Sequence, residues 1–198
     1  MSLLIESIKL LDGEFYNLSF HERRMKNSIK ALYGTAESIN LGDLLSNLKF
    51  AQTGLFKCRI VYDEVVREIE FLPYVPKIIH SLKVVTDDQI SYEHKYADRQ
   101  NLEELFRLRD ACDDILIVRD DHVTDSSYSN IVFKREGNWF TPKLPLLRGT
   151  MRKFLLESKM IRDADIRKAD IPAFESFKLI NAMLGFEGPE INISNIIF

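Results

Sequence analysis

Two segments in the second half of the chain carry residue types suited to binding chemistry. The stretch Val123–Phe133, V-T-D-S-S-Y-S-N-I-V-F, places one acid, Asp125, and a row of hydroxyl groups between apolar residues. Further along, Gly149 precedes a run with helical periodicity. A helix start presents backbone N–H groups and the positive end of the helix dipole, which favour an anion such as phosphate. The two segments therefore predict a binding site that contains the carboxylate of Asp125 and an anion-binding helix start after Gly149.

Two basic residues upstream extend this set. Lys95 lies in a polar segment between an expected strand and an expected helix, and Arg24 follows His21 by three residues near the start of another helix. Taken singly, a loop lysine and a turn aspartate are ordinary structural residues. Together, a lysine, a carboxylate and a phosphate-binding helix start are the protein groups that hold pyridoxal phosphate.

The segments follow one another in a recognisable order: H-x-x-R-M at His21–Met25, K-x-x-D-R at Lys95–Arg99, V-T-D-S-S-x-S-N-I-V-F, and L-x-G-x-x-R at Leu147–Arg152. In this order they resemble the class IV aminotransferases, a family that includes branched-chain and D-amino-acid aminotransferases and aminodeoxychorismate lyase. The resemblance extends from about Ile5 to Gly188. It implies an α+β, two-subdomain, fold-type IV (D-amino-acid aminotransferase-like) enzyme that uses pyridoxal 5'-phosphate, with a shortened N-terminal subdomain.

The resemblance assigns roles to individual residues. Lys95 would bond covalently to the cofactor and then carry the substrate proton, and a cavity with cationic or apolar neighbours would favour its reactive amine form. Asp125 would keep the pyridine nitrogen protonated. The family usually has Glu here, so the Asp backbone must approach closer by about 1.5 Å, roughly one carbon–carbon bond. Arg24 would hold two phosphate oxygens with its planar fork, whereas Arg23 would face solvent.

The remaining cofactor contacts are implied in the same way. The backbone N–H groups of Thr150 and Met151 would bind phosphate oxygens. This Thr-Met pair replaces the commoner Ile-Thr pair, which moves the hydroxyl group by one position. Ser129 and Asn130 would line the cofactor pocket. Asn181 would face the phosphate or the substrate, unless it is simply the end of a strand.

Other polar residues near these motifs have less defined roles. Tyr96, Arg99 and Arg148 are candidates for binding the substrate carboxylate. Arg152 is expected to be a structural ion-pair residue of the helix that follows Gly149.

Two details favour the lyase within the family. Lys95–Arg99 resembles its K-x-x-N-R pattern, and Asn181–Met183 resembles its N-A-L-M segment. The implied reaction converts 4-amino-4-deoxychorismate to p-aminobenzoate and pyruvate, a step of folate synthesis, in a homodimer. Transamination of branched-chain or D-amino acids is the alternative. A non-catalytic protein on the same fold is a further one, since the N-terminal hairpin of the family is absent and Asp125 replaces Glu.

The composition of the 198 residues limits the other classes. The 27 Lys and Arg against 30 Asp and Glu give a net charge of −3, which offers no basis for binding nucleic acid or an anionic membrane. The two cysteines, Cys58 and Cys112, form no disulfide framework, and the four histidines show no metal-ligand spacing. No signal-peptide core and no apolar run of ~20 residues occur. We expect a soluble, cytoplasmic protein without a metal site.

The predicted elements divide at Pro73 and Pro76 into a small N-terminal α/β subdomain, 1–78, and a larger cofactor-binding subdomain, 79–198. Apolar alternation and helical periodicity give the element types. Strands are expected at 3–11, 56–62, 65–72, 81–85, 115–118, 130–134, 139–140, 161–169, 177–182 and 191–197, and helices at 20–32, 42–50, 101–112 and 150–159.

Overall fold

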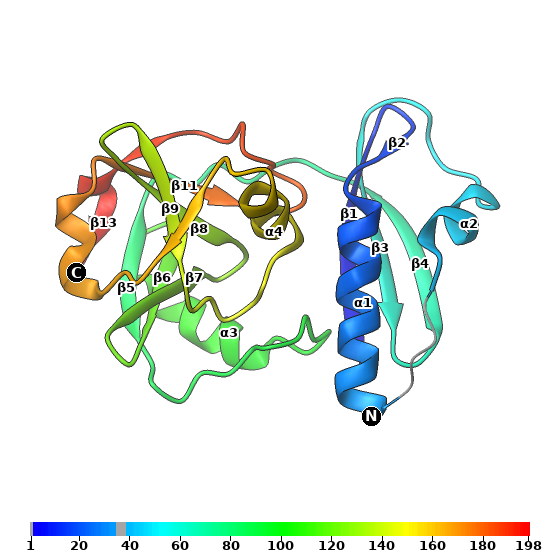
Figure 1. The fold of residues 1–198 in the computed structure, drawn as a ribbon, viewed down its shortest axis with the longest axis horizontal. Coiled ribbons are helices and arrows are strands. Elements are labelled where there is room, and N and C mark those ends of the chain that lie inside the picture. The colour runs from blue at the N-terminus through cyan, green and yellow to red at the C-terminus, as the bar shows by residue number, and fades with distance from the viewer. Residues whose placement is uncertain (1, 35–38) are drawn as a thin grey trace. The chain divides into compact units, whose positions relative to one another are not determined.

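The computed structural model describes residues 2–34 and 39–198, which form two compact units (Figure 1). Unit 1 comprises Met1–Pro76 together with a short return segment, His94–Asp98, and unit 2 comprises Lys77–Glu93 and Arg99–Phe198. A single boundary after residue 78 assigns the return segment to the second subdomain, whereas its contacts place it in unit 1. This matters for the site, because the segment carries Lys95.

Unit 1 is an antiparallel sheet in the order β2-β1-β3-β4 with both helices packed on one face. In β1, residues 4, 6, 8 and 10 are buried because side chains alternate across a strand. Leu4 and Ile8 join the apolar cluster of α1, α2 and β3. Glu6 is the acidic member of this buried row. The elements are β1 (Leu4–Leu11), β2 (Glu14–Phe15), α1 (Leu18–Tyr33), α2 (Leu41–Ser46), β3 (Leu55–Tyr62) and β4 (Val66–Pro73).

The start of α1 differs from the expected one. Ser19 is the cap expected for a helix over 20–32, because serine side chains often cap helix starts. The residue before the first helical turn is instead Asn17, whose φ of 57° is left-handed; asparagine tolerates this conformation better than most residues. Met25 and Ile29 are buried as the apolar stripe predicts, while Leu32 is 38% exposed. Within the described residues, no helix is long and apolar enough to cross a membrane.

Unit 2 is built on a nine-stranded mixed sheet with the path β10-β9-β8-β7-β6-β5-β13, and β11 pairs with β8 and β12. An apolar cluster that includes Phe133 and Phe177 forms its core. A second cluster, with Met151 and Leu155, packs α4 against β8 and β11. The elements are β5 (Leu82–Thr86), α3 (Gln100–Phe106), η1 (Arg107–Arg109), β6 (Asp114–Arg119), β7 (His122–Ser126), β8 (Asn130–Arg135), β9 (Asn138–Pro142), α4 (Thr150–Glu157), β10 (Arg162–Ala164), η2 (Lys168–Ala173), β11 (Ser176–Ile180), β12 (Ile191–Asn192), η3 (Ile193–Asn195) and β13 (Ile196–Ile197).

The helix expected over 101–112 is shorter in the structure. The α-helix ends at Phe106, a 3-10 turn follows, and Asp110 leaves the helical region with a φ of 52°. As a consequence, Leu108 is 54% exposed instead of facing the core. Cys112 lies in the turn after the helix rather than within it.

Three strand predictions are also corrected. The strand expected over 191–197 is divided into β12 and β13 by the 3-10 turn η3. The strand expected over 161–169 is limited to β10, and its expected last residues, Lys168 and Ala169, belong to the 3-10 turn η2. Conversely, β7 is not among the expected strands. Its last three residues are polar and yet buried, so the apolar alternation that marks a strand is missing from the sequence.

Candidate active site

A buried cluster in unit 1 is centred on Glu6. Glu6 on β1 and His21 on α1 are both fully buried. His21 Nδ1 lies 2.6 Å from Glu6 Oε2, and it donates the hydrogen bond because an ionised carboxylate only accepts. Arg24 donates from Nε to Glu6 Oε1 at 2.8 Å and from Nη2 to Oε2. The H-x-x-R spacing thus places both side chains on one helix face, where Glu6 holds them.

The charges of the partners decide the ionisation of this cluster. Burial raises the pKa of Glu6, but Arg24 and His21 outweigh it and lower the pKa to about 2. Burial lowers the pKa of His21, and the carboxylate of Glu6 opposes this only in part. Glu6 is therefore ionised and His21 neutral at pH 7. Glu6 engages two of the five N–H donors that a guanidinium group has.

Lys95 lies in the return segment beside the start of β1. Ile5 N–H donates to Lys95 O at 2.9 Å, and Ala97 N–H donates to Leu3 O at 2.8 Å, so the backbone around the lysine is fixed to β1. Its positive charge contributes to the lowered pKa of His21. Unit 1 therefore brings the predicted lysine into the electrostatic environment of the predicted phosphate-binding arginine.

Asp125 is the centre of a second network, in unit 2. It is 5% exposed and pairs with Asn130, across the turn between β7 and β8. Asn130 Nδ2 donates to Asp125 Oδ1 at 2.7 Å and to Leu147 O at 2.8 Å, while Leu147 N–H donates to Asp125 Oδ2 at 2.8 Å. Burial raises the pKa of Asp125 to about 6, against the opposing effect of these hydrogen bonds. A carboxylate has about four acceptor positions, so Asp125 can accept a further donor such as a protonated ring nitrogen.

The start of α4 has the features of an anion site. Gly149 is its N-cap and has no side chain with which to cap the first turn. A Cβ at residue 149 would lie 2.0 Å from Asn130 Oδ1, so the position needs glycine for space; its φ of −62° is ordinary. The N–H groups of Thr150 and Met151 belong to the first turn, which has no acceptors for them within the helix. This donor set fits the phosphate of pyridoxal phosphate.

Ser129 and Asn181, two of the predicted pocket residues, are in direct contact. Asn181 Nδ2 donates to Ser129 Oγ at 2.9 Å, and Ser126 N–H donates to Ser129 O at 2.9 Å, which closes the turn after β7. Asn181 Oδ1 accepts from the N–H groups of Met183 and Leu184, both at 2.9 Å. Asn181 therefore fixes the turn after β11 and also supports the hydroxyl-rich turn.

The three candidates for the substrate carboxylate are placed differently. Arg99 donates from Nη2 to Ser127 O at 2.6 Å, and its guanidinium lies 3.9 Å from the centre of the Tyr128 ring. It thus holds the hydroxyl-rich turn. Arg148 is exposed. Tyr96 belongs to unit 1, where it pairs with β1 and packs beside the apolar cluster.

Arg152 and Arg23 have structural surroundings. Arg152 is buried, and its hydrogen-bond partners, Thr141 Oγ1 at 3.2 Å and Pro142 O at 2.8 Å, are neutral. Burial lowers the pKa of Arg152, and the charges of Asp125 and Asp163 oppose this. Arg23 is exposed, as expected, and lies over the ring of Phe20 at 4.4 Å.

Two participants in these networks are given no role by the sequence analysis. Glu6 does leave a signal, because it is an acid at a buried position of an otherwise apolar alternation. Leu147 belongs to the L-x-G-x-x-R motif, but its role in the network leaves no signal, because it contributes only backbone atoms.

Comparison with known proteins identifies the family of this chain. The family profile described as amino-transferase class IV matches residues 3–187. An uncharacterized protein of Haemophilus influenzae is 36% identical over 184 residues, which is 92% of this chain and 98% of that protein. A crystal structure from Haemophilus somnus, provisionally described as a 4-amino-4-deoxychorismate lyase, is 34% identical, with a TM-score of 0.89 over 94% of this chain and 98% of that chain.

A more distant structure shares the fold. The PLP-bound form of a hypothetical aminotransferase from Mycobacterium tuberculosis is 18% identical, with a TM-score of 0.77 over 96% of this chain and 80% of that chain. These matches confirm the fold-type IV architecture expected from the sequence. Because the family profile spans nearly the whole chain, the protein belongs to the class IV aminotransferase family.

Proposed function

We propose that this pyridoxal-phosphate-dependent enzyme is a lyase that converts 4-amino-4-deoxychorismate to p-aminobenzoate and pyruvate. The observation that carries the proposal is the similarity to the Haemophilus somnus structure so described, which covers 94% of this chain at 34% identity. The segments Lys95–Arg99 and Asn181–Met183, which resemble the lyase patterns, support it independently.

The residues of the two networks divide the work of holding the cofactor. Arg24, fixed by Glu6, and the first-turn N–H groups of α4 would bind the phosphate. Asp125, ionised for the most part at pH 7 because its pKa is about 6, would hold a proton at the ring nitrogen. When bound, pyridoxal phosphate draws electrons from the substrate α-carbon. The proposed cofactor-binding residues are Arg24, Lys95, Asp125, Ser129, Asn130, Thr150, Met151 and Asn181.

Lys95 is the proposed catalytic residue. Its Nζ would bind the cofactor covalently and, once the amino group of the substrate has displaced it, would remove the proton from the substrate α-carbon as a free amine. The hydrogen bond from Ile5 N–H to Lys95 O, and the one from Ala97 N–H to Leu3 O just before β1, fix where the side chain begins. Such positioning is what a proton transfer over hydrogen-bond distance requires.

Transamination of branched-chain or D-amino acids is the second candidate, because the matching family profile is that of aminotransferases. The two reactions differ in what they consume. A transaminase needs a keto acid to complete its cycle, whereas the lyase reaction is complete with one substrate.

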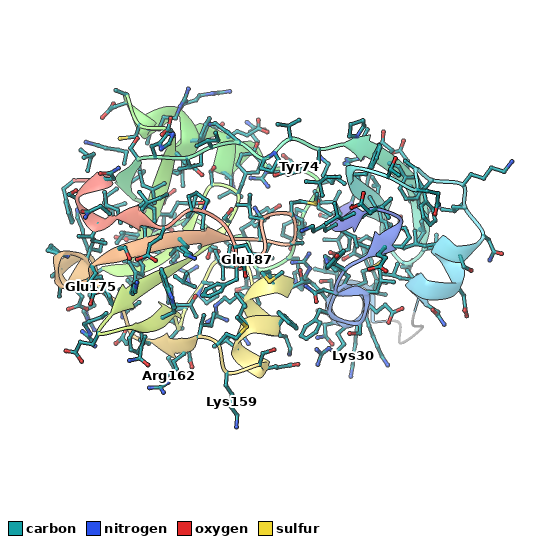
Figure 2. The ribbon with its side chains drawn as sticks, turned by 90° about the horizontal axis from the view of Figure 1, so that it is seen from above. Lys30, Tyr74, Lys159, Arg162, Glu175 and Glu187 are labelled. Atoms are coloured by element: carbon teal, nitrogen blue, oxygen red, sulfur yellow. The ribbon has the colours of Figure 1, made fainter. Side chains whose placement is uncertain are left out.

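The deciding experiment gives cofactor-loaded protein 4-amino-4-deoxychorismate without any keto acid and follows p-aminobenzoate by its fluorescence. We expect product formation that falls by about 10³-fold in Lys95→Ala. Lys30→Ala is the matched control, because Lys30 is exposed on α1 of the same unit (Figure 2). No product from protein that shows the absorbance band of lysine-bound cofactor would reject the lyase and favour transamination, which amino donors would then test.

The proposal includes a homodimer in the cytoplasm and a role in folate synthesis. The assembly is open to a direct measurement. Sedimentation equilibrium of the holoenzyme should give twice the mass of the chain, and the mass of one chain would contradict the dimer.

A further inference from the structure

The side chains of Asp125 and Asn130 hold both backbone polar groups of Leu147. Asp125 Oδ2 accepts from Leu147 N–H at 2.8 Å, Asn130 Nδ2 donates to Leu147 O at 2.8 Å, and the same amide donates to Asp125 Oδ1 at 2.7 Å. These three residues form a closed ring of hydrogen bonds, which we call the Leu147 clamp. Both side chains are at least nine-tenths buried, so water does not readily replace these bonds.

The clamp reaches the start of α4 through Gly149. Gly149 N–H donates to Leu147 O at 2.9 Å, and Asn130 Oδ1 occupies the space where a Cβ of residue 149 would be. Asn130 therefore uses both ends of its amide, with Nδ2 on Leu147 and Oδ1 against Gly149. A displacement of this side chain must move the backbone that leads into the first turn of α4.

We infer that Asn130, one of the proposed cofactor-binding residues, contributes as a positioning residue for the phosphate-binding turn, acting through Leu147 and Gly149 instead of lining the cofactor ring. The inference rests on the proposed function, in which the first turn of α4 binds the phosphate. The clamp also joins that turn to Asp125, the proposed partner of the ring nitrogen. The Leu147 clamp thereby supports the groups proposed for the phosphate and the group proposed for the ring nitrogen.

Pyridoxal, which lacks the phosphate, separates this role from direct contact with the ring. Pyridoxal and pyridoxal phosphate present the same ring and the same aldehyde to Lys95. A residue that contacts the ring affects the binding of both compounds. A residue that orients the phosphate-binding N–H groups affects the binding of pyridoxal phosphate alone.

The test titrates wild type, Asn130→Ala, Gly149→Ala and the double variant with each compound and follows the absorbance band of lysine-bound cofactor. We expect each single variant to bind pyridoxal phosphate about tenfold more weakly, as for the loss of one or two hydrogen bonds. Gly149→Ala should bind pyridoxal as the wild type does. Asn130→Ala should show a smaller loss for pyridoxal than for pyridoxal phosphate, because Asp125 loses the donor Asn130 Nδ2 but keeps the Leu147 N–H. Asn138→Ala, which removes an exposed asparagine of the same unit, is the matched control.

The double variant tests the mechanical link itself. Once the Asn130 amide is gone, the next atom that a Cβ at Gly149 meets is Arg152 Cβ at 3.9 Å, an ordinary contact. The two substitutions should therefore be non-additive, and the double variant should bind pyridoxal phosphate no more weakly than Asn130→Ala. Additive losses would overturn the link between Asn130 and Gly149.

The other outcomes separate the inference from the proposed function. Equal losses for both compounds, or unchanged binding of pyridoxal phosphate in Asn130→Ala, would overturn the inference and leave the proposed function standing. The absence of the band in wild type with both compounds would overturn the proposed function and the inference with it. If circular dichroism shows that Asn130→Ala is unfolded, Gly149→Ala takes its place, because it keeps every hydrogen-bonding group. Weaker binding of pyridoxal phosphate alone would then support the inference, and equal or no loss for the two compounds would overturn it.

Discussion

Each unit contains a buried carboxylate within a network, and the two differ in the charge of their partners. Glu6 in unit 1 is bonded to the cation Arg24 as well as to His21, and its pKa falls to about 2. Asp125 in unit 2 accepts from two neutral donors, an amide and a backbone N–H, and its pKa rises to about 6. Burial acts on both carboxylates in the same direction. The charge of Arg152 also lowers the pKa of Asp125, but Arg152 donates its hydrogen bonds to Thr141 and Pro142. The difference is therefore made by a cation that is hydrogen-bonded directly to the carboxylate, as Arg24 is to Glu6.

The difference suits the two carboxylates to different tasks. Glu6 stays an anion down to acidic pH, so it can hold Arg24 in place under all ordinary conditions. Asp125 changes between its neutral and ionised forms just below neutral pH, because its pKa is about 6. A positive charge that binds beside it favours the ionised form. In the proposed function that charge is the protonated ring nitrogen of the cofactor.

The largest expected effect comes from removing the anion in unit 1. Glu6→Gln leaves Arg24, whose side chain is 13% exposed, without its charged partner. We expect the free energy of unfolding at pH 7 to fall by about 3 kcal/mol. Because the pKa of Glu6 is lowered from 4.5 to about 2, this stabilisation is complete above pH 4.5 and is lost as the pH falls toward 2. The difference between wild type and variant should therefore shrink at pH 3.

Urea unfolding followed by circular dichroism at pH 7 and pH 3 measures this effect. Glu14→Gln, an exposed position on β2, is the matched control and should change little. A loss below about 1 kcal/mol at pH 7 would mean that the buried cluster is worth no more than a surface ion pair.

Asp125 should show the opposite pH dependence. Its pKa rises from 3.8 in the unfolded chain to about 6 in the folded protein, so the folded state binds the proton first. The associated stability is complete below pH 3.8 and is lost as the pH rises through 6. Relative to Asp125→Asn, which does not titrate, cofactor-free wild type should gain about 2 kcal/mol between pH 7 and pH 4.5. Urea unfolding followed by Trp139 fluorescence measures this change in unit 2. A decrease in the free energy of unfolding from pH 7 to pH 4.5 would contradict the contrast between Asp125 and Glu6.

The smallest effect separates the two partners of Glu6. His21→Gln removes a neutral donor and keeps Arg24, so we expect a loss of about 1 kcal/mol in unfolding free energy. The pKa of Glu6 should stay well below its usual range, as an NMR titration of the side-chain carboxyl carbon would show. If that pKa returns to the usual range, the histidine rather than the cation sets the charge.

The sequence predicts the fold best where periodicity and turn residues agree. The hairpin of β3 and β4 begins and ends within one residue of the expected positions, because apolar alternation flanks the polar pair Asp63–Glu64. The prediction fails at β7, where buried polar residues hide the alternation. It also fails at the end of α3, where the left-handed Asp110 is not marked by a glycine.

The candidate site is predictable in its residues and not in their partners. Motif order singles out Arg24, Lys95 and Asp125 from the sequence. Glu6, however, is 18 residues from Arg24, and Leu147 is 22 residues from Asp125. Such pairings depend on which strands and turns meet, and one of them is made through backbone atoms that every residue has.

A gene fragment that ends at Pro76 encodes every described strand and helix of unit 1 but lacks Lys95, because the chain passes through Lys77–Glu93 before it returns at His94–Asp98. If half-genes from two relatives were joined at Pro73–Pro76, the chimaera would take Arg24 from one parent and Lys95 from the other. All of unit 1 comes from one parent only when the crossover lies beyond Asp98. The segment that must be exchanged as one piece in a chimaera therefore extends to Asp98, beyond the continuous part of unit 1 that ends at Pro76.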